Sequence, residues 1–370
     1  MRAALGLASR GLGRVAPNPA VGCVLVRPDL GQSTHDGLVV GRGWTQPGGR
    51  PHAETEAIRR AGTLAQGAHA YVTLEPCNHQ GQTGPCTEAL IAAGITSATV
   101  ALEDPDPRVA GSGFKRLRDA GIAVRVGLLA DQARRLNAGF LSVVERKRPW
   151  VTMKTATTLD GAIASRTGHS QWITGPAARA RGHLLRAEND AIISGIGTVR
   201  ADDPELTCRL AGMTDRSPVR VIVDPRCEIS TNARLLQTLD LAPVWLLIGK
   251  DAPHDRVNAA KELGVKIITI QTVTGGRLDP LAMLEALAGQ GLTRVLLEAG
   301  STLSAVFMDA RLVDELAWFR AAGVMGGDGL PAIAPMAVNS PDNAPKFKLS
   351  DTIDLDGDVL ERYLRIESNH

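Results

Sequence analysis

A histidine, a glutamate and two cysteines in the first half of the chain have the spacing that a zinc-dependent hydrolytic site requires. His52 and Glu54 stand two residues apart, and Cys77 and Cys86 each follow a proline. Two thiolates and one imidazole suit a tetrahedral zinc whose fourth position is left open for water. The thiolates balance the two charges of the ion, which remains a Lewis acid able to ionise water near neutral pH. Glu54 is then free to take a proton from the water and deliver it to a departing nitrogen.

Geometry limits where these side chains can lie. Residues two apart in the middle of a helix point about 200° apart, so His52 and Glu54 cannot converge from such a position. We therefore expect His52 at the entry of the helix that carries Glu54, and Cys86 just before the next helix. A helix N-terminus near Cys86 would also help to hold it as a thiolate. This combination of His-x-Glu and Pro-Cys is the pattern of zinc-dependent nucleobase deaminases.

Two other interpretations of these residues stay open. A structural zinc usually has a fourth protein ligand, and His79 is the candidate because it lies between the two cysteines. The residues could also be two buried cysteines and a surface histidine. Cys23 lies in an apolar strand pattern and is predicted to be a core residue. Cys208 and Cys227 have no partner spacing and receive no role.

Short β-branched runs alternate with Ala/Leu/Arg-rich stretches, which is typical of α/β layers. Strands are predicted at 21–26, 70–73, 97–101, 123–127, 151–154, 191–194, 219–223, 244–248, 265–270, 295–298 and 315–319. Helices are predicted at 53–61, 87–93, 114–120, 131–145, 177–188, 280–289 and 304–310. Pro149 follows a charged helix end and cannot continue a helix. At roughly 100–200 residues per domain, the 370 residues then form two domains, 1–147 and 148–370.

Composition excludes several classes of protein. A net charge of +2 and only 3% aromatic residues disfavour a nucleic-acid partner. The apolar stretches fall well short of the roughly 18 residues of a membrane helix, and Arg10 and Arg14 interrupt the apolar N-terminus before any signal-peptide cleavage site. Five cysteines form no disulfide framework. We expect a cytoplasmic protein that acts on a small molecule, has no membrane partner, and forms a homo-oligomer, with a dimer favoured.

Three stretches of the first half resemble the deaminase half of the bifunctional riboflavin-biosynthesis deaminase–reductase family. They are PNPAVG at 17–22, LEPCNHQGQTGPC at 74–86 and EDPDPRVAG at 103–111. Eight residues separate the two cysteines, where the generic deaminase signature has two. In the family this longer loop shapes the pocket for a pyrimidinone that carries ribose phosphate. Gly84 stands where the family often has a second proline, beside a ligand without being one. The resemblance implies that Asn18 contacts the substrate; a plain turn residue between two prolines is the alternative.

The second half has no Gly-x-Gly-x-x-Gly fingerprint and no Walker loop. Two strand-to-helix turns rich in small residues, at 192–199 and 296–302, could bring backbone N–H groups to a phosphate, although a glycine after a strand most often only forms a turn. Residues 154–161, 172–174, 185–187, 197–204 and 224–225 are similar to the reductase half of the same family. The resemblance implies a cytidine deaminase-like α/β/α sandwich followed by a dihydrofolate reductase-like α/β domain that uses NADPH.

The same resemblance implies contacts for each ligand. NADPH would contact Ala156, Trp172, Thr198, Asp202 and the turn made of Gly300, Ser301, Thr302, Leu303, Ser304, Ala305 and Val306. The ribosyl substrate would contact Ser170, Arg186, Leu206, Arg209 and Glu298. The chemistry agrees in part, because Arg186 and Arg209 can hold a phosphate bidentately. Lys154, which we place among the substrate-binding residues, and Glu298 are candidate proton sources for reduction at a sugar carbon. The alternatives are arginines on a solvated face and Trp172 in the core.

These expectations describe a two-step enzyme of riboflavin synthesis. Its Zn²⁺-dependent half would hydrolyse the 2-amino group of 2,5-diamino-6-ribosylamino-4(3H)-pyrimidinone 5′-phosphate, and its NADPH-dependent half would reduce the ribosyl to the ribityl side chain. A nucleobase deaminase acting on RNA with an unrelated C-terminal domain is an alternative, which the near-neutral charge disfavours. A non-catalytic, zinc-stabilised binding protein is another; it predicts that Glu54 can be replaced without loss of activity.

Overall fold

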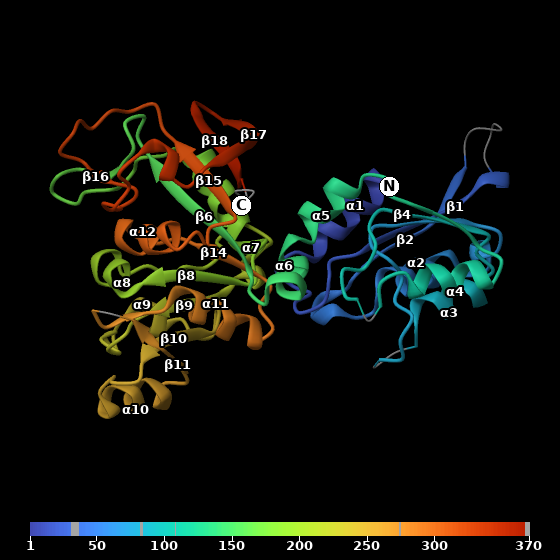
Figure 1. Cartoon of the computed structure of the whole chain (residues 1–370), viewed down its shortest axis with the longest axis horizontal. Coiled ribbons are helices and arrows are strands. Elements are labelled where there is room, and N and C mark those ends of the chain that lie inside the picture. Colours follow the sequence, from blue (N-terminus) through green and yellow to red (C-terminus); the bar gives the residue numbers. More distant parts are fainter. Residues whose placement is uncertain (31–36, 82–83, 108, 274, 367–370) are drawn as a thin grey trace. The chain divides into compact units, whose positions relative to one another are not determined.

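The computed structural model describes residues 1–30, 37–81, 84–107, 109–273 and 275–366. The stretches at 74–86 and 103–111 include residues 82–83 and 108, which lie outside the described residues. The chain divides into two compact units, Met1–Lys147 and Arg148–His370, each built on its own sheet (Figure 1). Every described helix is too short or too polar to span a lipid bilayer.

The first unit contains a five-stranded sheet in the order β2-β1-β3-β4-β5. Its strands are β1 (Gly22–Arg27), β2 (Leu38–Trp44), β3 (His69–Val72), β4 (Ser97–Val100) and β5 (Ala123–Val126). β1 pairs antiparallel with β2 and β3, whereas β3, β4 and β5 run parallel. Its helices are α1 (Arg2–Ala8), α2 (Ala53–Ala61), α3 (Cys86–Ala92), α4 (Ser112–Asp119), α5 (Ala130–Leu136) and α6 (Ala138–Arg146).

The alternation of side chains along β1 places helices on both faces of this sheet. Cys23 is fully buried in one hydrophobic cluster together with Ala53 of α2. Its neighbour Val24 belongs to a second cluster with Ala4 of α1. Because successive strand residues point to opposite faces, α1 and α2 cover opposite sides. Cys23 is therefore the core residue that its apolar context predicted.

Two glycines of β2 allow α2 to lie close against the sheet. A β-carbon on Gly43 would overlap the carbonyl oxygen of Ala53, and one on Gly41 would overlap that of Ala57. Any side chain at these positions would push the helix away from the strand. Since α2 begins directly after His52, this contact also fixes the position of His52.

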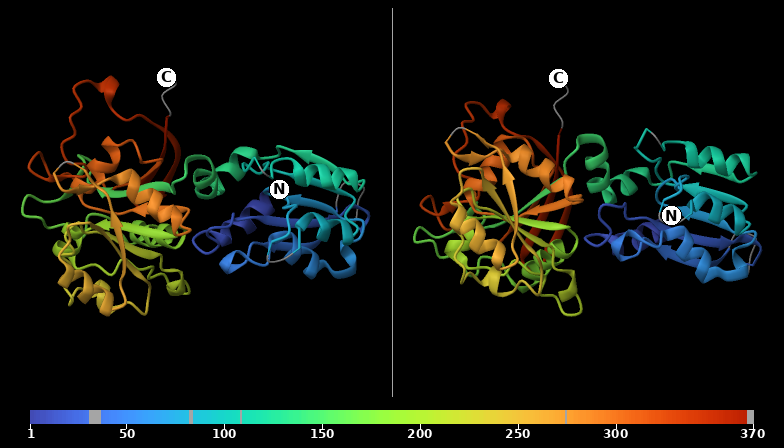
Figure 2. Two further views of the ribbon diagram at one scale, coloured as in Figure 1. Left: turned by 60° about the horizontal axis from the view of Figure 1, so that its bottom comes forward. Right: turned by 90° about the horizontal axis from the view of Figure 1, so that it is seen from below.

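The second unit contains a nine-stranded sheet in the order β11-β10-β9-β8-β14-β6-β15-β18-β17. Its strands are β6 (Trp150–Thr157), β8 (Ala191–Gly195), β9 (Val219–Val223), β10 (Val244–Gly249), β11 (Lys266–Ile270), β14 (Arg294–Leu297), β15 (Glu315–Arg320), β17 (Phe347–Leu355) and β18 (Asp358–Arg365). The strands from β11 to β15 in this order run parallel, and β18 pairs antiparallel with both of its neighbours, β15 and β17. The sheet is twisted (Figure 2). Two short pairs accompany it, β12 (Thr272–Val273) with β13 (Arg277–Leu278), and β16 (Leu330–Pro331) with β7 (Ala162–Ala164).

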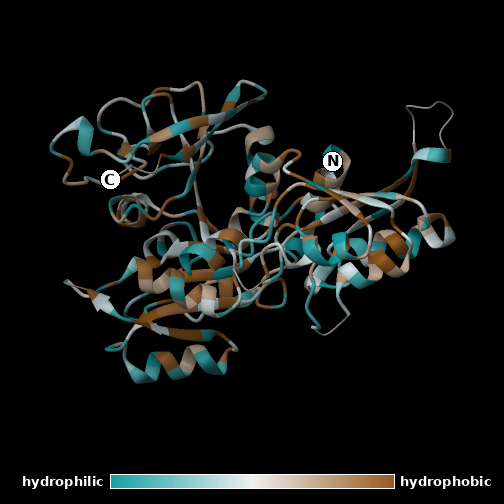
Figure 3. Ribbon diagram, turned by 45° about the vertical axis from the view of Figure 1, so that its right-hand side comes forward, coloured by the Kyte–Doolittle hydropathy of each residue, from teal (hydrophilic) through white to brown (hydrophobic). Residues whose placement is uncertain are grey.

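Helices cover both faces of this second sheet. They are α7 (Pro176–Ala187), α8 (Ile196–Asp202), α9 (Arg234–Gln237), α10 (His254–Glu262), α11 (Pro280–Gly289) and α12 (Ser301–Asp309). Ile193 of β8 belongs to one hydrophobic cluster and its neighbour Ile192 to another, so both faces are buried. Several strands of the sheet are accordingly brown in Figure 3. Because the carboxyl ends of parallel strands lie at the same edge of a sheet, the segments after β6, β8 and β14 gather at that edge.

The structure differs from the sequence predictions at several elements. α1, β2, α8, α10 and the β17–β18 hairpin were not predicted. The single helix predicted at 131–145 is broken into α5 and α6 at Asn137. The side chain of Asn137 is buried and pairs with the backbone of Ala20, accepting from its N–H at 2.9 Å and donating to its carbonyl at 3.1 Å. This long-range contact interrupts the helix.

Candidate functional sites

His52, Cys77 and Cys86 meet in the first unit. His52 is the N-cap residue of α2 and Cys86 is the first residue of α3, so both lie at helix entries, as the spacing required. His52 Nδ1 lies 3.2 Å from Cys86 Sγ and 3.6 Å from Cys77 Sγ, and the three ligand atoms lie within 4.8 Å of one another. Zn–N bonds of about 2.0 Å and Zn–S bonds of about 2.3 Å in a tetrahedral site separate nitrogen from sulfur by about 3.5 Å. The triad therefore fits zinc, through Nδ1 of His52.

The two cysteines of the triad are chemically linked. A hydrogen bond from Cys86 lowers the pKa of Cys77 to about 4, and the same contact raises the pKa of Cys86. The backbone N–H of Cys86 also donates to Cys77 Sγ at 3.4 Å. One thiolate is thus preformed, and a metal that binds here displaces the remaining thiol proton.

Glu54 lies beside this triad on the first turn of α2. Its side chain is buried and is a hydrogen-bond partner of Cys86. Burial raises the pKa of Glu54 to about 7, and the charge of Cys77 adds to the shift. Among the residues that the structure describes, the cluster of candidate metal ligands holds three members, and the exposed His79 is not one of them. The described residues thus supply no fourth protein ligand of the kind that a structural zinc would have.

Asn18 lies against the turn that precedes His52. Its backbone N–H donates to the carbonyl of Val15 at 2.9 Å, so Asn18 does take part in a turn. Its side-chain amide also packs on Gly49, where a β-carbon would overlap Nδ2 of Asn18. Gly49 has a φ of +84°, which a residue with a side chain rarely adopts. The amide is therefore held by the segment that leads to the first ligand of the triad.

Glu75 is a buried residue of this region to which the sequence assigned no role. Its carboxylate accepts four backbone hydrogen bonds, from Asp104 at 3.1 Å, Gly111 at 3.0 Å, Gly113 at 2.8 Å and Phe114 at 3.3 Å. Glu75 thereby ties the start of α4 and the loop before it to the segment that carries Cys77. An acidic residue directly before a Pro-Cys pair was the available signal, but its partners are backbone groups far along the chain.

The second unit contains a cavity of about 260 Å³ at the carboxyl edge of its parallel strands. The predicted residues that line it are Lys154, Ala156, Ser170, Trp172, Arg186, Arg209 and Glu298. The further lining residues include Arg179, His183 and Phe319, which were not predicted. The structure therefore brings together Lys154 and Glu298, which lie 144 positions apart in the chain.

Glu298 is the centre of an ion network in this cavity. Its Oε1 accepts from Arg186 Nη2 at 2.9 Å and from Lys154 Nζ at 3.2 Å, and its Oε2 accepts from Arg186 Nε at 3.0 Å. Burial alone would raise the pKa of Glu298, but the charges of Arg186 and Lys154 outweigh burial and hold that pKa well below its ordinary value. Glu298 is thus a carboxylate at neutral pH. Of the two candidate proton sources, this leaves Lys154.

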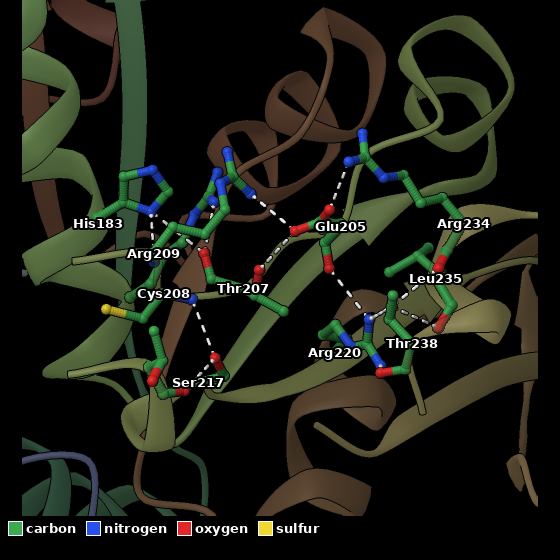
Figure 4. Close-up of polar contacts among 12 residues, drawn as sticks. His183, Glu205, Thr207, Cys208, Arg209, Ser217, Arg220, Arg234, Leu235 and Thr238 are labelled. Carbon is green, nitrogen blue, oxygen red and sulfur yellow. Dashed lines mark hydrogen bonds and ion pairs between the residues drawn. The ribbon is translucent and has the colours of Figure 1, made fainter. Parts of the chain in front are cut away.

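The two predicted phosphate-binding arginines differ in their surroundings. Arg186 already donates to Glu298, and its Nη1 donates to the carbonyl of Thr207 at 2.9 Å. Arg209 is 52% exposed and makes a long contact of 3.5 Å with Glu205, which Arg234 holds more closely at 2.6 Å (Figure 4). Arg209 therefore has the charge that is available to an anion.

The residues predicted to contact NADPH lie in several places. Trp172 is 70% exposed, which excludes the alternative of a core residue, and Arg179 stacks 4.5 Å from the centre of its ring. Thr198 Oγ1 accepts from the backbone N–H of Gly300 at 3.1 Å, so the turns after β8 and β14 are joined.

Other predicted residues are less accessible. Ser304 and Ala305 are buried in α12, so the exposed part of the turn from Gly300 is its beginning. Leu206 is buried and has a φ of +55°. Asp202 lies at the exposed end of α8, and partial burial raises the pKa of its carboxyl. Thr198, Asp202 and the turn are not among the residues that line the cavity.

Comparison with known proteins identifies the family of each unit. Residues 1–102 match the cytidine and deoxycytidylate deaminase zinc-binding region, and residues 149–360 match the RibD C-terminal domain. The riboflavin biosynthesis protein RibD of Bacillus amyloliquefaciens is 40% identical over 90% of this chain and 86% of its own. That of Escherichia coli is 37% identical over 97% of this chain and 96% of its own.

Solved structures give the same result over nearly the whole chain. RibD of Acinetobacter baumannii has a TM-score of 0.86 at 39% identity and covers 99% of this chain and 98% of its own. The deaminase/reductase of Thermotoga maritima has a TM-score of 0.83 at 32% identity, with 99% and 97% covered. The predicted fold, a cytidine deaminase-like domain followed by an α/β reductase domain, is confirmed. The chain therefore belongs to the RibD family, the bifunctional zinc-dependent deaminases and NADPH-dependent reductases of riboflavin biosynthesis.

Proposed function

We propose that residues 1–147 deaminate 2,5-diamino-6-ribosylamino-4(3H)-pyrimidinone 5′-phosphate and that residues 148–370 then reduce its ribosyl chain. The observation that carries the first step is the triad of His52, Cys77 and Cys86 with the buried Glu54 beside it. The substrate assignment is supported by the Thermotoga maritima relative, a diaminohydroxyphosphoribosylaminopyrimidine deaminase and 5-amino-6-(5-phosphoribosylamino)uracil reductase.

In the deaminase step, His52 Nδ1 and the two thiolates would hold zinc, which would supply the Lewis acidity that makes water nucleophilic near neutral pH. Glu54 takes a proton from that water and delivers it to the 2-amino nitrogen. A C–O bond forms at C2, the C2–N bond breaks, and ammonia leaves. Asn18 offers both an amide donor and an acceptor to the edge of the pyrimidinone.

In the reductase step, NADPH supplies the hydride when bound. The joined turns at Thr198 and Gly300 fit this cofactor, because they place small residues and backbone N–H groups at the carboxyl edge of β8 and β14. The net change breaks the bond between C1′ and the ring oxygen, and adds a hydride to C1′ and a proton to the oxygen. Lys154 holds that proton, and Glu298 orients Lys154. Arg209 binds the phosphate, and Ser170 lines the same cavity.

Removal of the metal tests the independence of the two sites. We expect a chelator to abolish ammonia release and to leave NADPH oxidation with the deaminated intermediate unchanged, because the reductase cavity contains no residue of the triad. A coupled assay that follows ammonia and NADPH absorbance together measures both. Added zinc should restore ammonia release. Loss of both activities on chelation would contradict separate sites.

Adjacent glycines test the contribution of Asn18. We expect Gly49→Ala to lower deamination about 10- to 100-fold, because the new methyl group displaces the Asn18 amide. Gly48→Ala is the matched control: its φ of +77° imposes a similar backbone strain, but no neighbouring atom lies within 4 Å of the added carbon. Ammonia release and thermal unfolding of both variants are measured. Equal losses of activity would show that strain, and not the Asn18 contact, is responsible.

We also propose that the enzyme is a cytoplasmic homodimer. The five cysteines are all free, which suits a reducing compartment. Light scattering of the purified enzyme measures its mass, and a monomer would overturn the dimer.

A further inference from the structure

The reductase cavity contains a histidine that the mechanism above does not use. His183 lies on α7 between Arg179 and Arg186, and its side chain lines the cavity. Figure 4 shows its ring against the backbone of the neighbouring segment, where Nδ1 lies 3.2 Å from the Thr207 carbonyl oxygen and 3.3 Å from the Arg209 nitrogen. Its Nε2 has no hydrogen-bond partner among the described residues. Since Nδ1 faces the backbone, the opposite nitrogen is the one presented to the cavity.

The segment that His183 contacts, residues 205–209, is held from several sides. Three further side chains bind its backbone: Arg220 donates to the Glu205 carbonyl at 3.2 Å, Arg186 donates to the Thr207 carbonyl at 2.9 Å, and Ser217 accepts from the Cys208 N–H at 3.1 Å. Leu206 within it has a φ of +55°, which a residue other than glycine rarely adopts. A segment fixed in this way gives Arg209 a defined position, and His183 links that position to α7.

The hydrogen bonds of this segment also determine the tautomer of His183. Thr207 already has a donor in Arg186, whereas the described acceptor of the Arg209 N–H is His183 Nδ1. Nδ1 as acceptor satisfies both backbone groups, and in a neutral imidazole the proton then lies on Nε2. Burial, with the charges of Arg186 and Arg209, lowers the pKa of His183 to about 4, so the ring is neutral at neutral pH. Nε2–H is therefore a hydrogen-bond donor directed at the cavity.

The charge around the cavity favours an anion at the end that His183 and Arg209 line. Its lining contains four cations and one carboxylate: Lys154, Arg179, Arg186, Arg209 and Glu298. Glu298 is shared between two of the cations, and Glu205, the partner of Arg209, is shared with Arg234. Arg209 is bound to His183 through its backbone, and the carboxylate that its guanidinium contacts is shared with Arg234. Phosphate oxygens are strong acceptors that suit both the guanidinium of Arg209 and the Nε2–H of His183.

We propose that His183 is a substrate-binding residue of the reductase, whose Nε2–H donates to a phosphate oxygen of the ribosyl substrate while its Nδ1 holds Arg209 beside the same group. This inference rests on the proposed reductase function. It adds a neutral hydrogen-bond donor to a phosphate site otherwise made of arginines, and it gives α7 a direct contact with the phosphate.

Asparagine and glutamine separate the two roles of the ring, because the amide of Asn reaches about as far as Nδ1 and that of Gln about as far as Nε2. We expect His183→Asn to raise both the KM for the deaminated intermediate and the inhibition constant of ribose 5-phosphate about 10- to 100-fold, with kcat little changed. His183→Gln keeps the donor to the phosphate and should bind at least several-fold more tightly than His183→Asn. NADPH affinity, measured by fluorescence, should stay the same in both variants.

The outcomes separate the two proposals. His254→Asn, on α10 and outside the cavity lining, is the control and should match the unsubstituted enzyme. If His183→Asn binds ribose 5-phosphate as well as His183→Gln or better, the ring serves only to hold the backbone of Arg209. The proposed contact with the phosphate is then wrong. If the unsubstituted enzyme does not oxidise NADPH with the deaminated intermediate, the proposed function itself fails. Thermal unfolding of each variant establishes that the second unit is folded in these comparisons.

Discussion

Replacing Glu54 with Gln reduces ammonia release at least ~100-fold, because the isosteric amide cannot carry a proton from water to the leaving nitrogen. Glu54 belongs to the first unit and is not one of the three candidate ligands, so zinc content and NADPH oxidation with the deaminated intermediate stay unchanged. Ammonia assays with the diamino substrate, together with elemental analysis for zinc, measure the effect.

Glu56→Gln is the matched control for this experiment. Glu56 lies on the same helix and is also buried, but it pairs with Arg59 at 2.8 Å and with Arg60 at 2.6 Å instead of facing the triad. Its replacement removes the charge from these two ion pairs and changes no group of the triad, so deamination should continue. Full deamination in Glu54→Gln would instead support a zinc that only stabilises the fold.

Replacing Lys154 with Met lowers kcat for the reduction by about 10²- to 10⁴-fold, because the cavity then lacks the group that holds the proton. Arg186 keeps its two hydrogen bonds to Glu298, so the carboxylate remains ionised and neutralised. The deaminase activity of the same chain is unaffected. The decrease of NADPH absorbance with the deaminated intermediate measures the loss.

Lys266→Met serves as its control, since Lys266 contacts Trp245 and is not among the residues that line the cavity. The separate changes in KM and kcat identify the role of Lys154. If Lys154→Met raises KM and leaves kcat unchanged, Lys154 binds the substrate and another group supplies the proton.

Spacing alone located the metal triad, because histidine, cysteine and glutamate have distinctive chemistry and helix entries limit where they can meet. Glu75 and His183 were missed because their partners carry no signal in the sequence. Their partners are backbone N–H and carbonyl groups of loops, which every residue has and no side-chain pattern identifies. Fold families and pairs of charged residues can be inferred from a sequence, whereas such contacts require the folded backbone.

The helices and strands likewise divide into those that the sequence predicts and those that depend on contacts in the folded chain. The parallel strands were predicted because buried strands are continuously apolar. β2 was missed because Gly41 and Gly43 suggest a turn, while the structure needs them for the approach of α2. α1 was missed because its apolar residues resemble a short leader, while Ala4 and Leu7 pack on the sheet. In each case a contact with a distant segment decided the local structure.

The glycines of β2 also bear on how this enzyme tolerates variation. Gly41 and Gly43 are not among the candidate metal ligands, yet a methyl group on either would lift α2 and carry His52 and Glu54 away from the two sulfurs. In a saturation-mutagenesis screen scored by riboflavin-dependent growth, alanine at either of these two positions should abolish growth as completely as alanine at a metal ligand does. A functional map of the deaminase therefore extends to strand positions that contact the backbone of α2 and supply no metal ligand.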